Sequence, residues 1–200
     1  MVSLPHLLLG LLRTPASGYE LKQQLDSIYS HAWNADLPQI YRTLNRMERD
    51  GWLTASAEPS DKGPERKVYT RTEAGLAAMS EWVGDAPPAE PPRSPELVRV
   101  LLLGENRELS MALNTLQAIR AGAEQALERL RATAREWASA DVSYPDCSDA
   151  NDFFLQLTLD ARIQELQARL AWASRCIYRV EARIRGSGGL RQEAHAEARR

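Results

Sequence analysis

The chain has 200 residues, with 25 lysines and arginines against 27 acidic residues, so its formal net charge is −2 at pH 7. That length allows one large domain or two small ones. The charge excludes a protein that binds nucleic acid through a global excess of positive charge, so such a ligand would need a local basic cluster.

The reactive residue types indicate neither a metal site nor a disulfide scaffold. Cys147 and Cys176 are the two cysteines, and neither has a partner at metal-ligand spacing, which favours a reducing compartment. The three histidines lie far apart in the sequence. The apolar run "LPHLLLGLL" is too short to cross a membrane and lacks the basic flank of a signal peptide. We therefore expect a soluble cytoplasmic protein with no metal or other cofactor.

A proline-rich segment divides the chain. Residues 84–95, "GDAPPAEPPRSP", hold five prolines, and proline neither continues a helix nor donates to a sheet ladder, so we interpret them as a linker. The linker separates an N-terminal domain, residues 1–83, from a C-terminal helical domain, residues 96–185. The last segment, residues 186–200, has three glycines and few apolar side chains, so we expect a flexible tail.

The N-terminal domain begins with three predicted helices. Leucines at helical spacing follow Ser3, which can cap the first helix. The stretch "SGYE" at residues 17–20 has the spacing of a capping box and predicts the start of the second helix. The third helix should run from about residue 36 to residue 50, and Gly51 suits a left-handed C-terminal cap.

A hairpin and a fourth helix complete this domain. The runs "WLTAS" and "KVYTRT" are rich in β-branched and aromatic residues and predict two short strands. Residues 57–66 between them are mostly turn formers and predict a long loop. Thr72 should begin the fourth helix, with Leu76, Met79 and Val83 facing inward. This order predicts a winged helix-turn-helix, so the fold class is mainly α with a small β-hairpin wing.

Two apolar seams predict a pair of long antiparallel helices in the C-terminal domain. They run from Leu109 to Trp137 and from Ile163 to Ile184, with the spacing of a coiled coil. The seams could pack on each other within one chain. Because the helices are long relative to the small domain that could cover them, we expect self-association instead, as a homodimer. The predicted dimerisation residues are Ile163, Leu166, Leu170, Ile177, Val180 and Ile184.

The predicted third helix has one apolar and one polar face. Ile40, Leu44 and Met47 share the apolar face, which should pack on the first two helices. The residues assigned to the opposite face are Gln39, Arg42, Thr43, Arg46 and Arg49. These residue types suit base edges and phosphates, and in helix-turn-helix proteins the N-terminal half of the second helix reaches the bases. We therefore predict that this face binds DNA.

A helix with exposed arginines is, taken alone, most often a solvated surface. The hairpin changes this balance because it adds Lys62, Arg66, Lys67 and Arg71. Over residues 38–71 there are seven basic and five acidic residues, an excess of two, so affinity should depend on dimerisation. The alternative is a winged-helix adaptor that binds proteins. An enzyme is disfavoured, because we find no nucleophile–base pair, phosphate-binding glycine loop or metal spacing.

The stretches "LLLGLL", "SGYEL", "QIYRTLNRMERDGWL" and "ERKVYTRTEAGLAAMSEW" resemble the PadR family of bacterial transcription regulators over residues 3–83. The C-terminal helices resemble the longer branch of that family, in which a helical domain related to that of virulence activators mediates dimerisation. The resemblance implies a homodimer that binds a palindromic operator in double-stranded DNA, usually as a repressor. It also implies that a small aromatic or hydrophobic effector can weaken DNA binding.

The resemblance also assigns residues. Gln39, Tyr41, Arg42, Thr43 and Arg46 match the recognition helix, and Arg66 and Lys67 match the wing, while Arg49 is better placed for the DNA backbone. Tyr41 could instead pack at the edge of the core. Many relatives have proline where this chain has Arg42, so their operator sequences do not transfer. Trp137 and Trp172 are candidate effector-binding residues at the dimer interface, although tryptophans on apolar faces are usually core.

Overall fold

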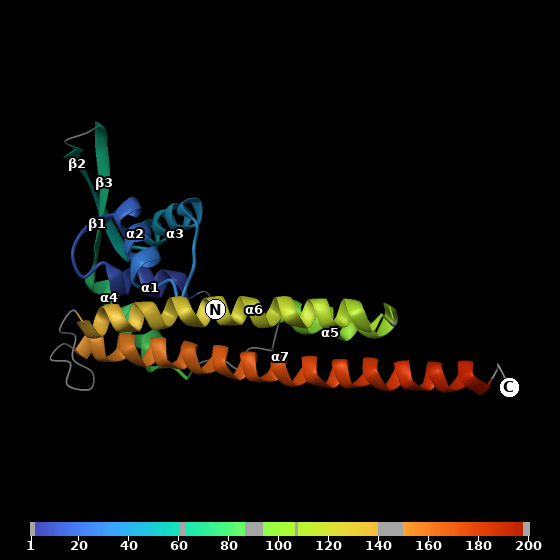
Figure 1. Cartoon of the computed structure of the whole chain (residues 1–200). Helices are drawn as coiled ribbons and strands as arrows, with labels where there is room; N and C mark the ends of the chain where they lie inside the picture. The colour runs from blue at the N-terminus through green and yellow to red at the C-terminus, as the bar shows by residue number, and fades with distance from the viewer. Residues whose placement is uncertain (1–2, 61–62, 87–93, 107, 140–149, 198–200) are drawn as a thin grey trace. The chain divides into compact units, whose positions relative to one another are not determined.

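The computed structural model describes residues 3–60, 63–86, 94–106, 108–139 and 150–197. The chain divides into two compact units, Met1–Glu90 and Pro91–Arg200, and the division falls within the proline-rich segment (Figure 1). Among the described residues no helix is long and apolar enough to cross a membrane.

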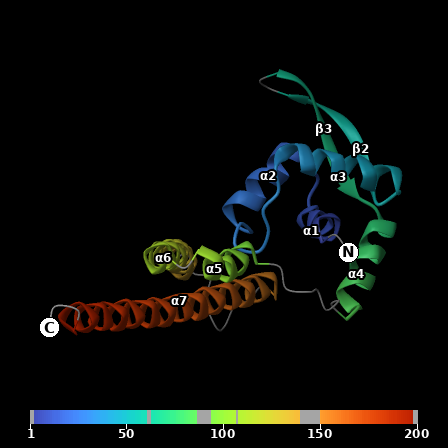
Figure 2. The same cartoon turned by 90° about the vertical axis from the view of Figure 1, so that its right-hand side faces the viewer.

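Four helices and a three-stranded antiparallel sheet form the first unit. The helices are α1 (Leu4–Leu11), α2 (Gly18–Ser27), α3 (Leu37–Arg49) and α4 (Glu73–Gly84). The strands are β1 (Ala16–Ser17), β2 (Leu53–Ser60) and β3 (Gly63–Arg71), in the order β1-β3-β2. Figure 2 shows the β2–β3 hairpin projecting beyond the helices. The predicted winged helix-turn-helix is confirmed, and β1 is a third strand that we did not predict.

Side-chain caps fix where α2 and α3 begin. Ser17 Oγ accepts a hydrogen bond from the Glu20 amide, and the Glu20 carboxylate accepts one from the Ser17 amide at 2.7 Å, so the predicted capping box is confirmed. Asp36 caps α3 by accepting from the Gln39 amide at 2.7 Å. Ser3 precedes α1, but its side chain makes no cap hydrogen bond, which differs from our expectation.

The start of α4 is tied to the turn that follows α3. Gly51 has a φ of 76°, the left-handed conformation that we predicted there. Thr72 Oγ1 donates to the Gly51 carbonyl at 2.8 Å, and the Thr72 amide donates to the Trp52 carbonyl at 3.0 Å. Gly75 lies so close to this turn that an added Cβ would be 2.3 Å from the Trp52 carbonyl oxygen and 2.8 Å from Leu9 Cδ2.

We expect Gly75→Ala to lower the free energy of unfolding by about 1–3 kcal/mol, because the methyl group would push α4 away from a backbone carbonyl. Chemical denaturation of the full chain would measure the loss. Gly84→Ala is the matched control, since it lies on the same helix with no atom within 4 Å of an added Cβ. Equal stability of the two variants would contradict the close packing at Gly75.

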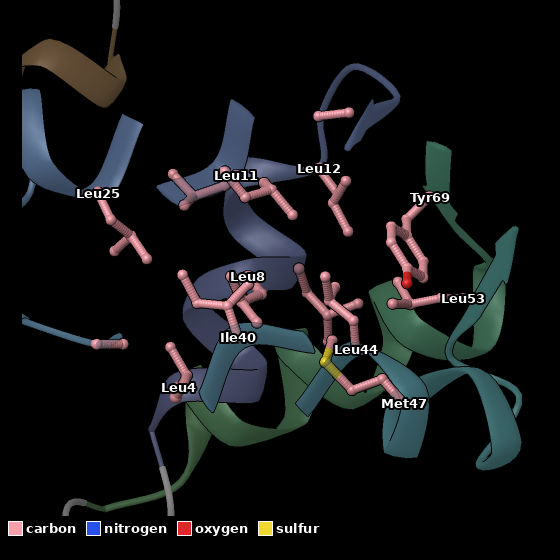
Figure 3. Packing of buried hydrophobic residues seen from close by; sticks show 14 residues of the cluster. Leu4, Leu8, Leu11, Leu12, Leu25, Ile40, Leu44, Met47, Leu53 and Tyr69 are labelled. Atoms are coloured by element: carbon pink, nitrogen blue, oxygen red, sulfur yellow. The ribbon is translucent and has the colours of Figure 1, made fainter. Parts of the chain in front are cut away.

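The hydrophobic core of the first unit lies between α1, α2, α3 and the sheet (Figure 3). Its fully buried side chains include Leu4, Leu8, Leu9, Leu21, Leu25, Ile40, Leu44, Met47 and Tyr69. The predicted apolar face of α3 is therefore confirmed. Burial of one such side chain contributes about 1.5–3 kcal/mol, so these contacts hold α3 firmly against α1 and α2.

The buried face of α4 differs from the prediction. Met79 packs against the core as predicted, but Leu76 and Val83 are exposed, and Gly75 and Trp82 take their places on the side that faces α1. The Trp82 ring stacks on the His6 ring of α1 at a centroid distance of 4.7 Å. Both faces have helical spacing, and the face with Gly75 turns inward because glycine allows the closer approach of α4 to the turn at Trp52.

The hairpin strands are longer than predicted, and most of the expected loop at residues 57–66 is strand. The register runs from Leu53 opposite Arg71 to Glu58 opposite Arg66, and it shifts between Glu58 and Ser60. Pro59, which cannot donate to the ladder, lies at this shift. Glu58 and Arg66 form an ion pair at 3.2 Å, and such a cross-strand pair of opposite charges favours continued pairing.

Three helices form the second unit: α5 (Pro95–Asn106), α6 (Leu109–Ser139) and α7 (Ala150–Glu197). The last two run antiparallel to each other (Figure 1). We did not predict α5, which an ion pair between Glu96 and Arg169 joins to α7 at 3.0 Å. α7 continues from residue 186 to Glu197, and the flexibility that we expected for this tail stays a prediction.

Packing within one chain uses part of the seam that we assigned to dimerisation. The buried residues of α6 are Leu116, Ala123 and Leu127, and those of α7 are Leu159, Leu166, Ala173 and Ile177. We therefore withdraw Leu166 and Ile177 as dimer contacts, because packing within the same chain already buries them. Ile163, Leu170 and Val180 are half-buried, and Ile184 is exposed. Their role in dimerisation stays a prediction.

Candidate nucleic-acid interface

The outer face of α3 carries the arginines of the predicted reading helix. Arg42, Arg46 and Arg49 are exposed, and Gln39 is half-buried at the N-terminal end. Within the described part of the chain, Arg42 and Arg46 have no carboxylate partner, whereas Arg49 Nε donates to the Asn45 carbonyl at 3.4 Å. Two guanidinium groups one helical turn apart are thus available for an external anion.

Asn45 is an exposed residue of this face that we missed in the sequence. It lies three residues after Arg42 and four before Arg49, so these side chains are neighbours on the helix surface. An asparagine amide can donate to and accept from an adenine edge. The spacing alone could have identified it.

Thr43 lies at the border between the two faces of α3, and not on the exposed polar face where we placed it. It is only 9% exposed, and its hydroxyl donates to the Gln39 carbonyl at 2.8 Å within the same helix. The reason is angular: at about 100° per residue, Thr43 is roughly 40° from Met47 and equally far from Gln39, so it borders the core. The expected contact between the Thr43 side chain and a base edge does not fit this position.

Tyr41 packs at the edge of the core, which is one of the two alternatives that the sequence left open. Its ring lies directly over Gly18, where an added Cβ would be 2.5 Å from Tyr41 Cε1. Glycine at the first position of α2 thus lets the two helices of the motif approach each other. Tyr41 is 36% exposed, and its contact with a phosphate stays a prediction.

The two basic wing residues that the sequence singled out are both held by carboxylates. Arg66 bonds to Glu20 of α2 at 2.8 Å and to Glu58 of β2 at 3.2 Å. Lys67 bonds to Glu48 of α3 at 2.6 Å. The sequence gives no signal for these pairs, because their partners lie up to 46 residues apart along the chain.

These contacts change the protonation equilibria of the groups involved. The hydrogen bond from the Ser17 amide, with help from Arg66, holds the pKa of the Glu20 carboxyl below its usual value. Hydrogen bonding to Glu58 raises the pKa of the Arg66 guanidinium, and hydrogen bonding to Glu48 raises the pKa of the Lys67 ammonium. All three groups are therefore charged at neutral pH.

The candidate effector residues lie far apart within one chain. Trp137 and Trp172 are both half-buried. At about 1.5 Å per residue, Trp137 is roughly 3 Å from the end of α6, whereas Trp172 is roughly 33 Å from the start of α7. Because α6 and α7 run antiparallel with the end of α6 beside the start of α7 (Figure 1), the two tryptophans cannot line one small pocket in a single chain. Separately, within the described residues no group of three or more His, Cys, Asp or Glu side chains could hold a metal, and Cys147 lies outside them.

Comparison with known families accounts for most of the chain. Residues 7–81 match the transcriptional regulator PadR-like family, and residues 92–181 match the virulence activator alpha C-terminal domain. The chain therefore carries a PadR-like family domain followed by a virulence activator alpha C-terminal domain. It carries the C-terminal domain of the longer branch, as the sequence resemblance implied.

Two curated relatives of this chain carry the names of transcriptional regulators. It is 36% identical over 93 residues to a probable transcriptional regulator of Mycobacterium tuberculosis, covering 46% of this chain and 48% of that protein. It is 30% identical over 81 residues to the negative transcriptional regulator PadR of Bacillus subtilis, covering 40% of this chain and 44% of that one. The chain thus spans about half the length of the curated relatives it matches.

Solved structures share the fold over most of this PadR-like chain. Bacillus subtilis PadR in complex with operator DNA matches with a TM-score of 0.76 and 20% identity, covering 90% of this chain and 99% of that one. The same protein with p-coumaric acid gives a TM-score of 0.72 at 19% identity and the same coverage. The Vibrio cholerae virulence activator AphA gives 0.72 at 23% identity, again covering 90% and 99%. At these identities the likeness establishes the fold.

Proposed function

We propose that this PadR-like protein is a cytoplasmic, homodimeric transcription regulator that binds double-stranded DNA through the outer face of α3. The observation that carries the proposal is the pair of exposed arginines, Arg42 and Arg46, without carboxylate partners in the described part of the chain. A guanidinium presents two parallel donors to guanine or to a phosphate. A relative of the same fold is known bound to operator DNA.

In this proposal α3 enters the major groove. Gln39 and Arg42, in the N-terminal half of the helix, reach base edges, and Arg46 follows one turn later. Arg49 lies near the helix end and contacts the phosphate backbone. Arg66 and Lys67 of the wing also approach phosphates, once they leave the carboxylates that hold them. Contacts to phosphates position the protein, and contacts to bases supply specificity.

Two copies are needed, because one copy offers few phosphate contacts. A symmetric dimer places two α3 helices about one turn of B-form DNA apart and therefore reads a palindromic operator. The second unit leaves apolar side chains uncovered, among them Leu97, Leu101 and Leu102 of α5 and Phe154 of α7, and Leu101 is 77% exposed. We assign the dimer contact to this unit, with these residues joining the half-buried part of the seam.

We further propose that the protein acts as a repressor that a small aromatic compound releases. Support comes from Bacillus subtilis PadR, which is named a negative regulator and is known in complex with p-coumaric acid. If Trp137 and Trp172 both contact such an effector, they must come from different chains, since they lie roughly 30 Å apart within one.

A winged-helix adaptor that binds proteins is the alternative function. The two explanations make different demands on α3. An adaptor would cover Arg42 and Arg46 with acidic side chains of another protein, whereas a DNA-binding protein needs them free for bases and phosphates. The polar side chains retained on both α3 and the wing favour DNA.

The test is to titrate the full chain into a duplex taken from immediately upstream of its own gene, with excess unrelated DNA present. We expect a discrete complex with two chains per duplex, which p-coumaric acid or a related phenolic compound weakens. A complex with one chain per duplex would contradict the dimer. Failure to prefer the upstream duplex at any protein concentration would favour the adaptor.

A further inference from the structure

The cations of the proposed DNA-binding surface fall into two groups. Arg42 and Arg46 on α3 have no carboxylate partner among the described residues, whereas Arg66 and Lys67 on the wing are both paired. The two wing pairs connect β3 to the two helices of the motif, Arg66 to α2 and Lys67 to α3. The wing is therefore held by ion pairs at the places where it would have to meet phosphates.

The pair between Lys67 and Glu48 is the simpler of the two. Lys67 Nζ lies 2.6 Å from Glu48 Oε2 and 5.2 Å from the centroid of the Tyr69 ring. This places the ammonium group beside α3, while the Lys67 side chain remains exposed. Among the described residues, the Glu48 carboxylate forms a hydrogen bond and ion pair with Lys67 alone, and only the backbone carbonyl of Glu48 takes part in the C-terminal cap of α3. Its carboxylate neutralises one of the few cations of the wing.

A phosphate and the Glu48 carboxylate would compete for the same ammonium group. If Lys67 kept its carboxylate partner in the complex, Glu48 would stand beside a DNA phosphate, and two anions at close range repel each other. Lysine has a flexible stem that can turn from one anion to another. When Lys67 exchanges Glu48 for a phosphate, the Lys67–Glu48 ion pair is lost, but the repulsion between Glu48 and the phosphate is removed.

We propose that Glu48 lowers the DNA affinity of this protein. It forms an ion pair with Lys67 in the unbound state, and this pair must break before Lys67 can bind a phosphate. The proposal rests on the DNA-binding function proposed above. Glu20 forms an ion pair with Arg66 in the same way, but Glu20 also caps α2, so its replacement would disturb the fold as well. Glu48 is the residue on which the effect can be measured cleanly.

The test is a double-mutant cycle with Glu48→Gln and Lys67→Gln, measured as affinity for the upstream duplex at low salt. We expect Glu48→Gln to raise the affinity by about two- to fivefold, the effect of breaking one exposed ion pair. Lys67→Gln should weaken the wild-type protein only slightly, but it should weaken the Glu48→Gln protein several-fold more, because Lys67 is then free to bind phosphate.

Glu65→Gln is the matched control. Glu65 is exposed, has no ion pair among the described residues and lies two positions from Lys67 on β3, hence on the same strand face. The Glu65→Gln substitution removes the same charge without freeing Lys67. Lys67→Gln should therefore lower the DNA affinity by the same factor in the Glu65→Gln protein as in the wild type. If Lys67→Gln costs equal affinity with and without Glu48, or costs less without it, the competition is disproved. The proposed function fails separately, if the wild-type chain does not bind the duplex.

Discussion

Leu44→Ala will lower the free energy of unfolding by about 2–5 kcal/mol, because it removes a fully buried side chain from the centre of the first unit (Figure 3). Leu44 lies on the face of α3 opposite the arginines and holds the helix against α1. Urea denaturation of the full chain, followed by circular dichroism, would show an earlier transition for the first unit.

Leu76→Ala provides the control for this loss. It deletes the same atoms from a helix of the same unit, but Leu76 is exposed, so the expected change is below about 0.5 kcal/mol. Similar losses in the two variants would mean that the core does not lie where the structure places it. Because the core positions α3, Leu44→Ala should also weaken DNA binding near its melting temperature.

The double variant Arg42→Ala, Arg46→Ala should weaken operator binding by at least about 100-fold, since each contact of this type contributes about 1–3 kcal/mol and the dimer has two copies of each. Both side chains are exposed and neither belongs to the core, so the free energy of unfolding should not change. Fluorescence anisotropy with a labelled upstream duplex would measure the affinity.

Arg175→Ala with Arg179→Ala is the matched control for that loss. These two arginines have the same four-residue spacing, are exposed on α7 and remove the same charge from the chain. We expect the control to bind the duplex within about twofold of the wild type, because neither arginine belongs to the proposed DNA-binding surface of α3 and the wing. Equal weakening by both double variants would show that net charge, and not the face of α3, determines affinity.

Local features of the first unit could be predicted from the sequence. The capping box at Ser17 and the left-handed Gly51 depend on a few adjacent residues, and the structure confirms both. The apolar spacing of Ile40, Leu44 and Met47 likewise identified the buried face of α3. In each case the signal and its structural consequence lie within one or two helical turns.

What could not be predicted depends on partners that are distant in the sequence. Thr43 borders the polar and apolar faces of α3, and only the packing of the neighbouring elements buries it. Glu20 is recognisable as a capping residue, but its bond to Arg66 arises only when the hairpin folds against α2. Leu166 belongs to a seam that fits either a second copy or the same chain, and α6 proved long enough to cover it. The role of every candidate DNA-contacting residue remains a prediction.

The salt dependence of binding to the upstream duplex tests the account most directly. Two copies with at least two phosphate contacts each release the counterions of about four phosphates, so the slope of log affinity against log salt should be about −3.6 or steeper. Between about 50 and 200 mM salt the affinity should then fall by roughly 100-fold or more. An affinity that stays constant over this range would contradict DNA binding by the basic side chains of α3 and the wing.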